Sequence, residues 1–252
     1  MVIFSFLIMM TASVLPGYGY DWSPEMMLTW NSETDANPSV AQASDGKVWI
    51  VWHSYRSGNA DIFYKVYDPS NVHPWSLEKN LTTDTNGDIS PSVMQANDGK
   101  IWVVWSTSRT GNYEIYCKTT SDNGATWSEE QNLTANPKED ECPSIMQTAG
   151  GTIWLVWSAN RTGNFDIYYK TSQDNGATWA TDKSLNYPET NDRNPSIAQA
   201  ADGKIWFVWV RDKNLNLNIW YKIYNATSNS WSATTQVTQD SGDILDFSPF
   251  IL

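Results

Sequence analysis

The stretch PSVMQANDGKIWVVW, residues 91–105, decides how this chain of 252 residues folds. Versions of it begin at Pro38, Pro143 and Pro195, so that the copies follow one another at intervals of about 52 residues. A period near 50 residues is typical of repeat proteins, in which one unit cannot bury its apolar faces alone and packs against its neighbours. We therefore predict that any functional surface is built by several units together.

Each unit reads as four short strands joined by tight turns. In the second unit the strands are expected at 92–95, 101–106, 113–119 and 127–133. The Asp-Gly and Gly-Asn pairs between them supply the positive φ values that tight turns need. The strand at 101–106 is apolar on both faces, which indicates burial between two layers. Four antiparallel strands of this kind form one blade, so the fold class is predicted to be an all-β propeller with four full blades and partial blade pieces at both ends.

The third turn of the unit carries the most specific motif, TSDNGATW at 120–127 and SQDNGATW at 172–179. This motif resembles the Asp box of sialidase-like propellers, also called the BNR repeat, and the resemblance covers the chain from about residue 21 to its end. It implies a structural role for the box. The aspartate bonds backbone N–H groups of the turn, the glycine takes a left-handed conformation, and the tryptophan fills the gap between strands. The box residues are Asp122, Gly124, Thr126 and Trp127 in the second unit, and Asp174, Gly176, Thr178 and Trp179 in the third.

The two ends of the repeat region hold incomplete units. Residues 22–30 match a fourth strand, because Trp22 precedes Pro38 by the same spacing that separates Trp75 from Pro91. Residues 248–252 match a first strand that has no further strands after it. We therefore predict that residues 20–252 form one sialidase-like propeller that is incomplete in its fifth blade, and that blades or domains of a longer chain are missing.

The N-terminus holds the only long apolar run, residues 3–15, which is too short to span a bilayer. Small residues at Gly17 and Gly19 suit a cleavage site, so residues 1–19 are predicted to be a signal peptide. The alternative is a buried first strand, since the basic residues that usually begin a signal peptide are missing. A signal peptide would place the protein outside the cell, either secreted or at the cell surface.

The charge and the residue composition limit which partners and cofactors can be expected. A net charge of −12 disfavours nucleic acid, and a membrane contact beyond the leader is not expected. The two histidines, His53 and His73, occupy unlike positions, which leaves no basis for a zinc site or a catalytic triad. No cofactor is expected, with Ca²⁺ at acidic loops such as 84–88 as the alternative. Cys117 and Cys142 could form a disulfide only if the fold brings them together.

The second turn carries an arginine in every unit, and these side chains are the candidate ligand-binding residues. They are Arg56, Arg109, Arg161 and, in a divergent turn, Arg211. Because antiparallel strands alternate in direction, this turn shares one end of the molecule with acidic loops between the units. The arginines would bind carboxylates or sugar hydroxyls of a ligand. Alternatively, each one would pair with a neighbouring acidic loop or stack on an aromatic ring and so hold one blade to the next.

The resemblance to sialidases also implies a catalytic set of three arginines, a tyrosine nucleophile with its glutamate, and an acid/base aspartate. This sequence lacks the F/Y-R-I-P motif of that set. Glu114 aligns with Asp61 of the first unit and reads as a strand-start residue, while Tyr116 and Tyr168 share an aromatic packing position. We therefore expect a non-catalytic module that binds an extracellular glycan or protein. The alternatives are an exo-α-sialidase-type glycoside hydrolase and a purely structural surface repeat.

Overall fold

The computed structural model describes residues 24–185, 190–213, 216–238 and 249–251. The predicted signal peptide lies outside these residues. The chain divides into a first unit, Met1–Ser32, and a second unit, Glu33–Leu252, which holds every strand of the described part. None of the described residues forms a helix long and apolar enough to cross a bilayer.

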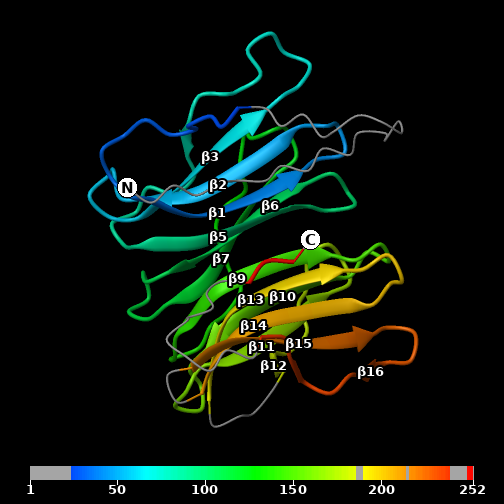
Figure 1. The fold of residues 1–252 in the computed structure, drawn as a ribbon. Coiled ribbons are helices and arrows are strands. Elements are labelled where there is room, and N and C mark those ends of the chain that lie inside the picture. The colour runs from blue at the N-terminus through cyan, green and yellow to red at the C-terminus, as the bar shows by residue number, and fades with distance from the viewer. Residues whose placement is uncertain (1–23, 186–189, 214–215, 239–248, 252) are drawn as a thin grey trace. The chain divides into compact units, whose positions relative to one another are not determined.

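The second unit contains four antiparallel sheets, here called blades 1 to 4 in chain order (Figure 1). Blade 1 consists of β1 (Asp35–Gln42), β2 (Val48–Ser54), β3 (Asp61–Tyr67) and β4 (Lys79–Asn80). Blade 2 consists of β5 (Asp88–Gln95), β6 (Ile101–Thr107), β7 (Glu114–Thr120) and β8 (Gln131–Asn132). Blade 3 consists of β9 (Asp140–Gln147), β10 (Ile153–Ala159), β11 (Asp166–Ser172) and β12 (Lys183–Ser184). Blade 4 consists of β13 (Asn191–Gln199), β14 (Ile205–Lys213), β15 (Asn216–Asn225) and β16 (Ser230–Trp231), and β17 (Thr235–Gln236) also pairs with β15. The all-β architecture with four-stranded blades is the predicted one.

The hydrophobic core lies between neighbouring blades, as expected for strands that are apolar on both faces. All seven residues of β2, β6 and β10 are buried. One core cluster joins Trp49 and Tyr64 of blade 1 to Val103 and Trp105 of blade 2, and two similar clusters join blades 2 and 3 and blades 3 and 4. A single blade therefore has no core of its own, in agreement with the reasoning from the repeat.

The first strand of each blade is longer than the sequence predicted. In blade 2 it begins at Asp88 and not at Ser92, and its pairing with β6 is interrupted between Ile89 and Ser92. The interruption is a β-bulge, in which Ser90 has a φ of 53°. The equivalent residues of the other blades have φ values of 48° for Asn37, 53° for Cys142 and 53° for Asn194. The residue before each Pro-Ser pair is left-handed, so the alternation of apolar and polar residues is broken there. The residues of the strand that precede the bulge therefore cannot be recognised from the sequence pattern.

The fourth strands are shorter than predicted. Residues 127–133 were expected as a strand, whereas only Gln131 and Asn132 pair with β7. Trp127 instead packs against blade 1, where its ring lies 6.0 Å from Trp49 and 5.4 Å from Tyr64. The Ser128 N–H still donates to the Thr119 carbonyl at 2.9 Å and the Leu133 N–H to the Ile115 carbonyl at 2.7 Å, so the segment follows β7 while Trp127 contacts blade 1.

The fourth strand expected at Trp22–Trp30 was wrong over its described part. Residues 24–30 form no strand, and Met26, Met27 and Trp30 are largely exposed. Strands β4, β8 and β12 each pair only with the third strand of their own blade. Among the described residues no third strand precedes β1, so the pairing that β4, β8 and β12 make has no counterpart there.

Neighbouring first strands are joined by a repeated hydrogen bond. The Val93 N–H donates to Ser39 Oγ at 3.2 Å, and the Ile145 N–H donates to Ser92 Oγ at 3.3 Å. Ile251 makes the same bond to Ser196 Oγ of β13 at 3.2 Å. Residues 249–251 therefore lie where a further first strand would lie, although these three residues are not in a strand.

The two cysteines are free thiols in different strands, so the disulfide considered from the sequence does not form. Cys117 is buried in β7, and burial raises its pKa to about 12. Cys142 is the left-handed residue of β9, and burial raises its pKa to about 11. Both thiols therefore stay protonated at neutral pH.

Candidate functional site at the start of the first strands

Antiparallel pairing puts the second turns and the beginnings of the first strands at one end of each blade. We call this the arginine end, because Arg56, Arg109, Arg161 and Arg211 lie there. The turns with the Asp boxes lie at the opposite end, as the strand directions predicted. Each first strand starts with Asp35, Asp88, Asp140 or, one residue inside β13, Asp192.

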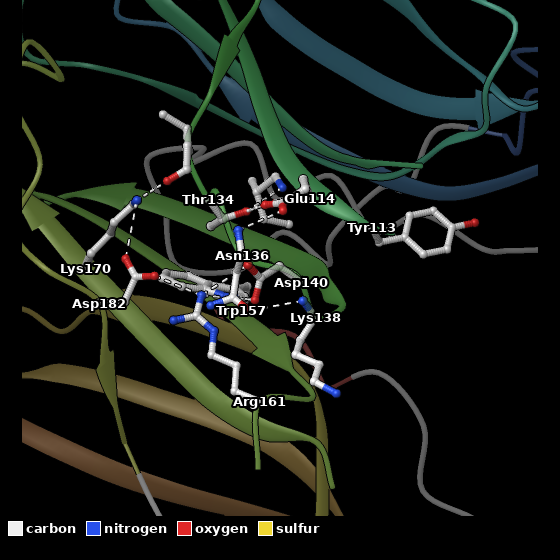
Figure 2. A network of polar contacts seen from close by, with 12 residues as sticks. Tyr113, Glu114, Thr134, Asn136, Lys138, Asp140, Trp157, Arg161, Lys170 and Asp182 are labelled. Atoms are coloured by element: carbon white, nitrogen blue, oxygen red, sulfur yellow. Dashed lines mark hydrogen bonds and ion pairs between the residues drawn. The ribbon is translucent and has the colours of Figure 1, made fainter. Parts of the chain in front are cut away.

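Arg161 shows the arrangement in its fullest form (Figure 2). Its Nη2 donates to both carboxylate oxygens of Asp140 at 3.1 Å, and it also pairs with Asp182 at 2.8 Å. The guanidinium lies 4.5 Å from the ring centroid of Tyr168. Asp140 has no exposed surface and accepts a further bond from Trp157 Nε1 at 2.9 Å. Burial raises the pKa of Asp140 to about 6, although the attraction of Arg161 opposes the rise.

The same contacts recur in blades 1 and 2. Arg109 pairs with Asp84 at 2.6 Å, with Asp88 at 3.3 Å and with Glu130, and it lies 4.5 Å from the ring centroid of Tyr116. In blade 1, Arg56 pairs with Asp35 at 3.1 Å and with Glu78, and it lies 4.3 Å from the ring centroid of Phe63. Both kinds of local contact that the sequence suggested are therefore present. Most of these carboxylates belong to the same blade as their arginine, whereas Asp84 lies in the link between β4 and β5, so Arg109 also contacts a segment that joins two blades.

Arg211 reaches the same contacts from a different position. It lies on β14, where it is paired with Asn218 of β15. The corresponding position in blade 3 is held by Ala159, which is paired with Asp166. Its Nε and Nη2 each donate to Asp192 at 2.7 Å, and its guanidinium lies 4.5 Å from the ring centroid of Trp220. The divergent second turn of blade 4 has thus moved the arginine along the chain while preserving its partners.

Glu114 is held as a structural carboxylate, in line with its interpretation as a strand-start residue. Its side chain is buried, and it accepts hydrogen bonds from Thr134 Oγ1 and from the Asn136 N–H, both at 2.8 Å (Figure 2). The Asn112 side chain adds a bond at 3.3 Å. These donors compensate for the burial of the charge and fix the link between β8 and β9.

A second set of side chains at the arginine end differs from blade to blade. The position held by Tyr113 is Ala60 in blade 1 and Phe165 in blade 3. The position held by Glu141 is Arg193 in blade 4. We call Tyr55, Tyr113, Glu141, Cys142 and Arg193 the variable group. These positions give the arginine end side chains that differ from one blade to the next.

The variable group draws on all four blades, with Tyr55 in blade 1, Tyr113 in blade 2, Glu141 and Cys142 in blade 3, and Arg193 in blade 4. Arg193 Nη1 lies 3.5 Å from Glu141 Oε2, and its guanidinium lies 3.5 Å from the ring centroid of Phe165. Burial raises the pKa of Tyr113, and Glu141 and Tyr55 nearby raise it further. Burial also raises the pKa of Glu141. In Figure 2 the Tyr113 ring extends away from the network around Asp140 and Arg161.

Sequence reasoning missed the variable group because it looked for what the units share. The available signal was the opposite one, a repeat position whose residue type changes from unit to unit. The side chain of Arg193 is 46% exposed and Tyr55 is 46% exposed, so both can reach a ligand. The repeated arginines are only 11–22% exposed.

The Asp boxes lie at the opposite end and have the geometry that the motif predicted. Thr126 donates to Asp122 from its N–H at 2.9 Å and from its hydroxyl at 2.6 Å. Gly124 has a φ of 76° and its carbonyl accepts a bond from Tyr64 of blade 1 at 3.1 Å. In blade 3, Thr178 makes the same two bonds to Asp174 at 2.9 and 2.5 Å, Gly176 has a φ of 85°, and Trp179 packs toward Trp102 of blade 2.

Among the residues that the structure describes, no three His, Cys, Asp or Glu side chains come together to hold a metal ion. In the loop considered for Ca²⁺, Asp84 and Asp88 pair with Arg109. Calcium binding stays a prediction without a defined ligand set.

Comparison with known proteins matches the chain to one family. A family model described as the BNR repeat-like domain matches residues 8–214. A sialidase of Paraclostridium sordellii is 24% identical over 201 residues, which are 65% of this chain and 50% of that protein. The chain thus spans about half the length of this curated relative.

Solved structures share the fold at low sequence identity. A Dyadobacter fermentans protein of unknown function is 14% identical, with a TM-score of 0.65, over 81% of this chain and 69% of its own. The Penicillium chrysogenum α-L-arabinanase, solved with arabinobiose, is 15% identical, with a TM-score of 0.66, over 86% and 70%. The NanB sialidase of Streptococcus pneumoniae is 10% identical, with a TM-score of 0.66, over 88% and 55%. These likenesses establish the propeller fold.

Proposed function

Since the chain belongs to the family of BNR repeat-like domains, we propose that it is an extracellular propeller module that recognises a glycan or a protein without catalysing a reaction. The observation that carries this proposal is the state of the repeated arginines. Each one already holds a carboxylate of its own blade, at 3.1 Å in the case of Arg161 and Asp140. A guanidinium with such a partner must break a buried ion pair before it can bind a carboxylate of a substrate.

We place recognition at the variable group. Its exposed tyrosine and arginine offer an aromatic face and a planar set of donors, which suit sugar rings and hydroxyl groups. Glu141 supplies an acceptor beside them. The repeated arginines would then act beneath this surface by fixing the starts of the first strands, and a direct contact of Arg56, Arg109, Arg161 or Arg211 with the ligand stays a prediction.

The test is binding of the purified chain to an array of extracellular glycans and to candidate surface proteins. The folded state should be checked on the same sample. We expect Arg193→Ala and Glu141→Gln to lower the affinity for a bound ligand at least tenfold, since each removes a charge-assisted hydrogen bond. Lys204→Ala, at the opposite end, is the matched control and should bind as the unaltered chain does. Equal affinities for all variants would remove the variable group from the binding surface.

A sialidase-type hydrolase is the second candidate, and one feature favours it. Tyr113, Glu141 and Arg193 place a tyrosine, a carboxylate and a guanidinium in one region. Against this role, burial and the nearby Glu141 raise the pKa of Tyr113, which disfavours the ionised form of its hydroxyl. Hydrolysis of a fluorogenic aryl sialoside decides between the candidates. Turnover by the unaltered chain that is lost in the Tyr113→Phe variant would establish the hydrolase. If the folded, unaltered chain shows no turnover, the result supports recognition without catalysis by this chain.

A further inference from the structure

A hollow with a volume of about 470 Å³ lies between blades 2 and 3, at the end that carries the Asp boxes. Blade 2 contributes Asn97 and Asp98 of its first turn. Blade 3 contributes Gln147, residues 150–152 of its first turn, and Gln173 and Asn175 of its Asp-box turn. The lining is made of amides, a hydroxyl and backbone, with one carboxylate.

The hollow lies where blade 3 departs from the repeat. In blades 1, 2 and 4 the first turn holds an Asp-Gly-Lys sequence, whose lysine pairs with the aspartate two residues earlier. In blade 3 the corresponding residues are Gly150, Gly151 and Thr152. In blade 1 the lysine of this pair, Lys47, also approaches Asp68 near the third turn at 3.9 Å. Blade 3 lacks the long side chain that would extend toward its Asp-box turn.

The structural contacts of the first turn survive this change. Gln147 accepts a bond from the Asn97 N–H and donates to the Gly151 carbonyl, as Gln199 does with Ala149 and Gly203 in the next pair of blades. Blade packing therefore does not explain why the aspartate and the lysine are absent from blade 3. Without this aspartate and lysine, the first turn of blade 3 has one negative and one positive charge fewer, and a space is left between blades 2 and 3.

The groups left in the hollow are neutral hydrogen-bonding groups. Gln147 Nε2 orients Asn175 by a bond of 2.9 Å to its Oδ1, which leaves the Asn175 NH₂ protons available. Within the described part of the chain, the Gln173 amide makes no hydrogen bond. Asp98 is occupied by the N–H of Lys100 at 3.1 Å and by its ammonium group at 2.9 Å. The site therefore offers paired amide donors and acceptors without a net charge.

We propose that this hollow is a second binding site, specific for a neutral saccharide. Amide side chains match the alternating donors and acceptors of sugar hydroxyl groups, and the absence of an unpaired charge disfavours an anionic sugar. No aromatic ring lines the hollow, so stacking does not contribute. The affinity is expected to be on the order of millimolar, which a few net hydrogen bonds can supply.

The test uses the full chain, labelled with ¹⁵N and titrated separately with lactose, cellobiose and xylobiose. We expect at least one disaccharide to produce saturable shifts of the side-chain amide signals of Gln173 and Asn175. The double variant Gly150→Asp/Thr152→Lys restores the sequence of the sister blades and should weaken binding at least tenfold. Gly150 has room for this change, because an added Cβ would meet only Thr148 Oγ1 at 3.8 Å.

Two controls keep the result interpretable. Asp202→Gly/Lys204→Thr removes the same pair from blade 4 and should leave the titration unchanged. Arg193→Ala alters the arginine end and should also leave it unchanged, so that this site is tested separately from the recognition proposed above. Urea unfolding verifies that each variant is folded. The absence of saturable shifts up to about 50 mM, or equal binding by the repeat-restoring variant, would overturn the proposal.

Discussion

At the scale of single residues, the buried aspartate at the start of a first strand depends on one arginine. Asp140 has no exposed surface, whereas the Asp35 side chain is 17% exposed. Both carboxylates have an arginine partner at 3.1 Å. The same kind of ion pair therefore exists in a buried and in a partly hydrated form within one protein. The two pairs should contribute differently to the free energy of unfolding.

Arg161→Ala is expected to lower the free energy of unfolding by about 3–5 kcal/mol, because it leaves the Asp140 carboxylate buried without its cation. Arg56→Ala is the matched variant and should cost about 1 kcal/mol, since water can reach Asp35. Urea unfolding of the two variants measures the difference. Equal losses would mean that the exposure of the carboxylate does not control the strength of the pair.

The Asp-box aspartates give the chain a predictable response to acid. Hydrogen bonds from Thr126 hold the pKa of Asp122 at about 2, and bonds from Thr178 do the same for Asp174. A pKa lowered on folding stabilises the folded state above the unfolded-state value of about 4, and this contribution is lost as the pH falls toward 2.

The double variant Asp122→Asn/Asp174→Asn should therefore show a shallower loss of stability between about pH 4 and pH 2 than the unaltered chain. Urea unfolding at a series of pH values gives the two slopes. Glu129→Gln, at an exposed position outside the box, serves as the control and should retain the steeper slope. Identical slopes for the double variant and the unaltered chain would show that the boxes do not bind their carboxylates as the structure indicates.

At the scale of elements, the Asp-box turn is an interface as well as a turn. A Cβ added to Gly176 would lie 2.1 Å from Cη2 of Trp102, a residue of blade 2. Gly151, in the first turn of the same blade, has a similar φ of 89° but nothing within 4 Å of an added Cβ. The two glycines thus separate the cost of a left-handed backbone from the cost of a clash.

Gly151→Ala is expected to lower the free energy of unfolding by about 1–2 kcal/mol, the cost of a non-glycine residue in the left-handed region. Gly176→Ala should cost roughly 1–3 kcal/mol more, because Trp102 must move away from the new methyl group. Thermal or urea unfolding distinguishes the two. Similar losses of unfolding free energy in the two variants would indicate that Trp102 of blade 2 moves away from the new methyl group at no measurable cost.

The strands themselves were predictable, but their ends were not. Turn residues and an apolar run on both faces located the second and third strands of blade 2 to within a residue, because these features act locally. In blade 4, where the second turn diverges, β14 and β15 are two to three residues longer than their counterparts. The first strands extend past a bulge whose left-handed residue is Asn37, Ser90, Cys142 or Asn194, and no common residue type marks that position. The fourth strand of blade 2 is reduced to two paired residues, and the contact of Trp127 with Trp49 of blade 1 is one that a single unit does not encode.

The arginines of the candidate site were found for the same reason, since a repeated residue in a repeated turn is visible in the sequence. Their carboxylate partners were expected only as neighbouring loops. Arg161 pairs with Asp140, which lies 21 residues before it, and with Asp182, which lies 21 residues after it. The variable group was not recognised, because its members lie on four different blades and come together only in the folded chain.

At the scale of the whole molecule, the blades are fastened by few kinds of contact that recur at each junction. The third-strand lysines donate to a leucine carbonyl of the preceding blade, as Lys118 does to Leu81 at 3.0 Å and Lys222 does to Leu185 at 3.1 Å. First strands are joined through serine hydroxyls, and Ser196 extends this series to Ile251. Each junction thus has a polar fastening beside its apolar core.

Ser196→Ala should increase the hydrogen-exchange rate of the Ile251 amide about fivefold, the effect of losing roughly 1 kcal/mol of hydrogen bonding. The exchange rates of the Val93 and Ile145 amides, whose acceptors are other serines, should stay the same and provide the internal control. Exchange by NMR or mass spectrometry gives all three rates. An unchanged rate at Ile251 would show that residues 249–251 are not held by β13.

The tryptophans of the Asp boxes have a consequence for optical spectroscopy. Trp127 of blade 2 lies 6.0 Å from Trp49 of blade 1 with its plane at 89°, and Trp179 of blade 3 lies 6.5 Å from Trp102 of blade 2 at 79°. Indole chromophores this close share their electronic excitations, and the resulting exciton signal in circular dichroism vanishes when the rings separate. Each such pair joins two neighbouring blades. The protein therefore carries built-in optical reporters of its blade junctions, which can be followed during unfolding without any attached dye.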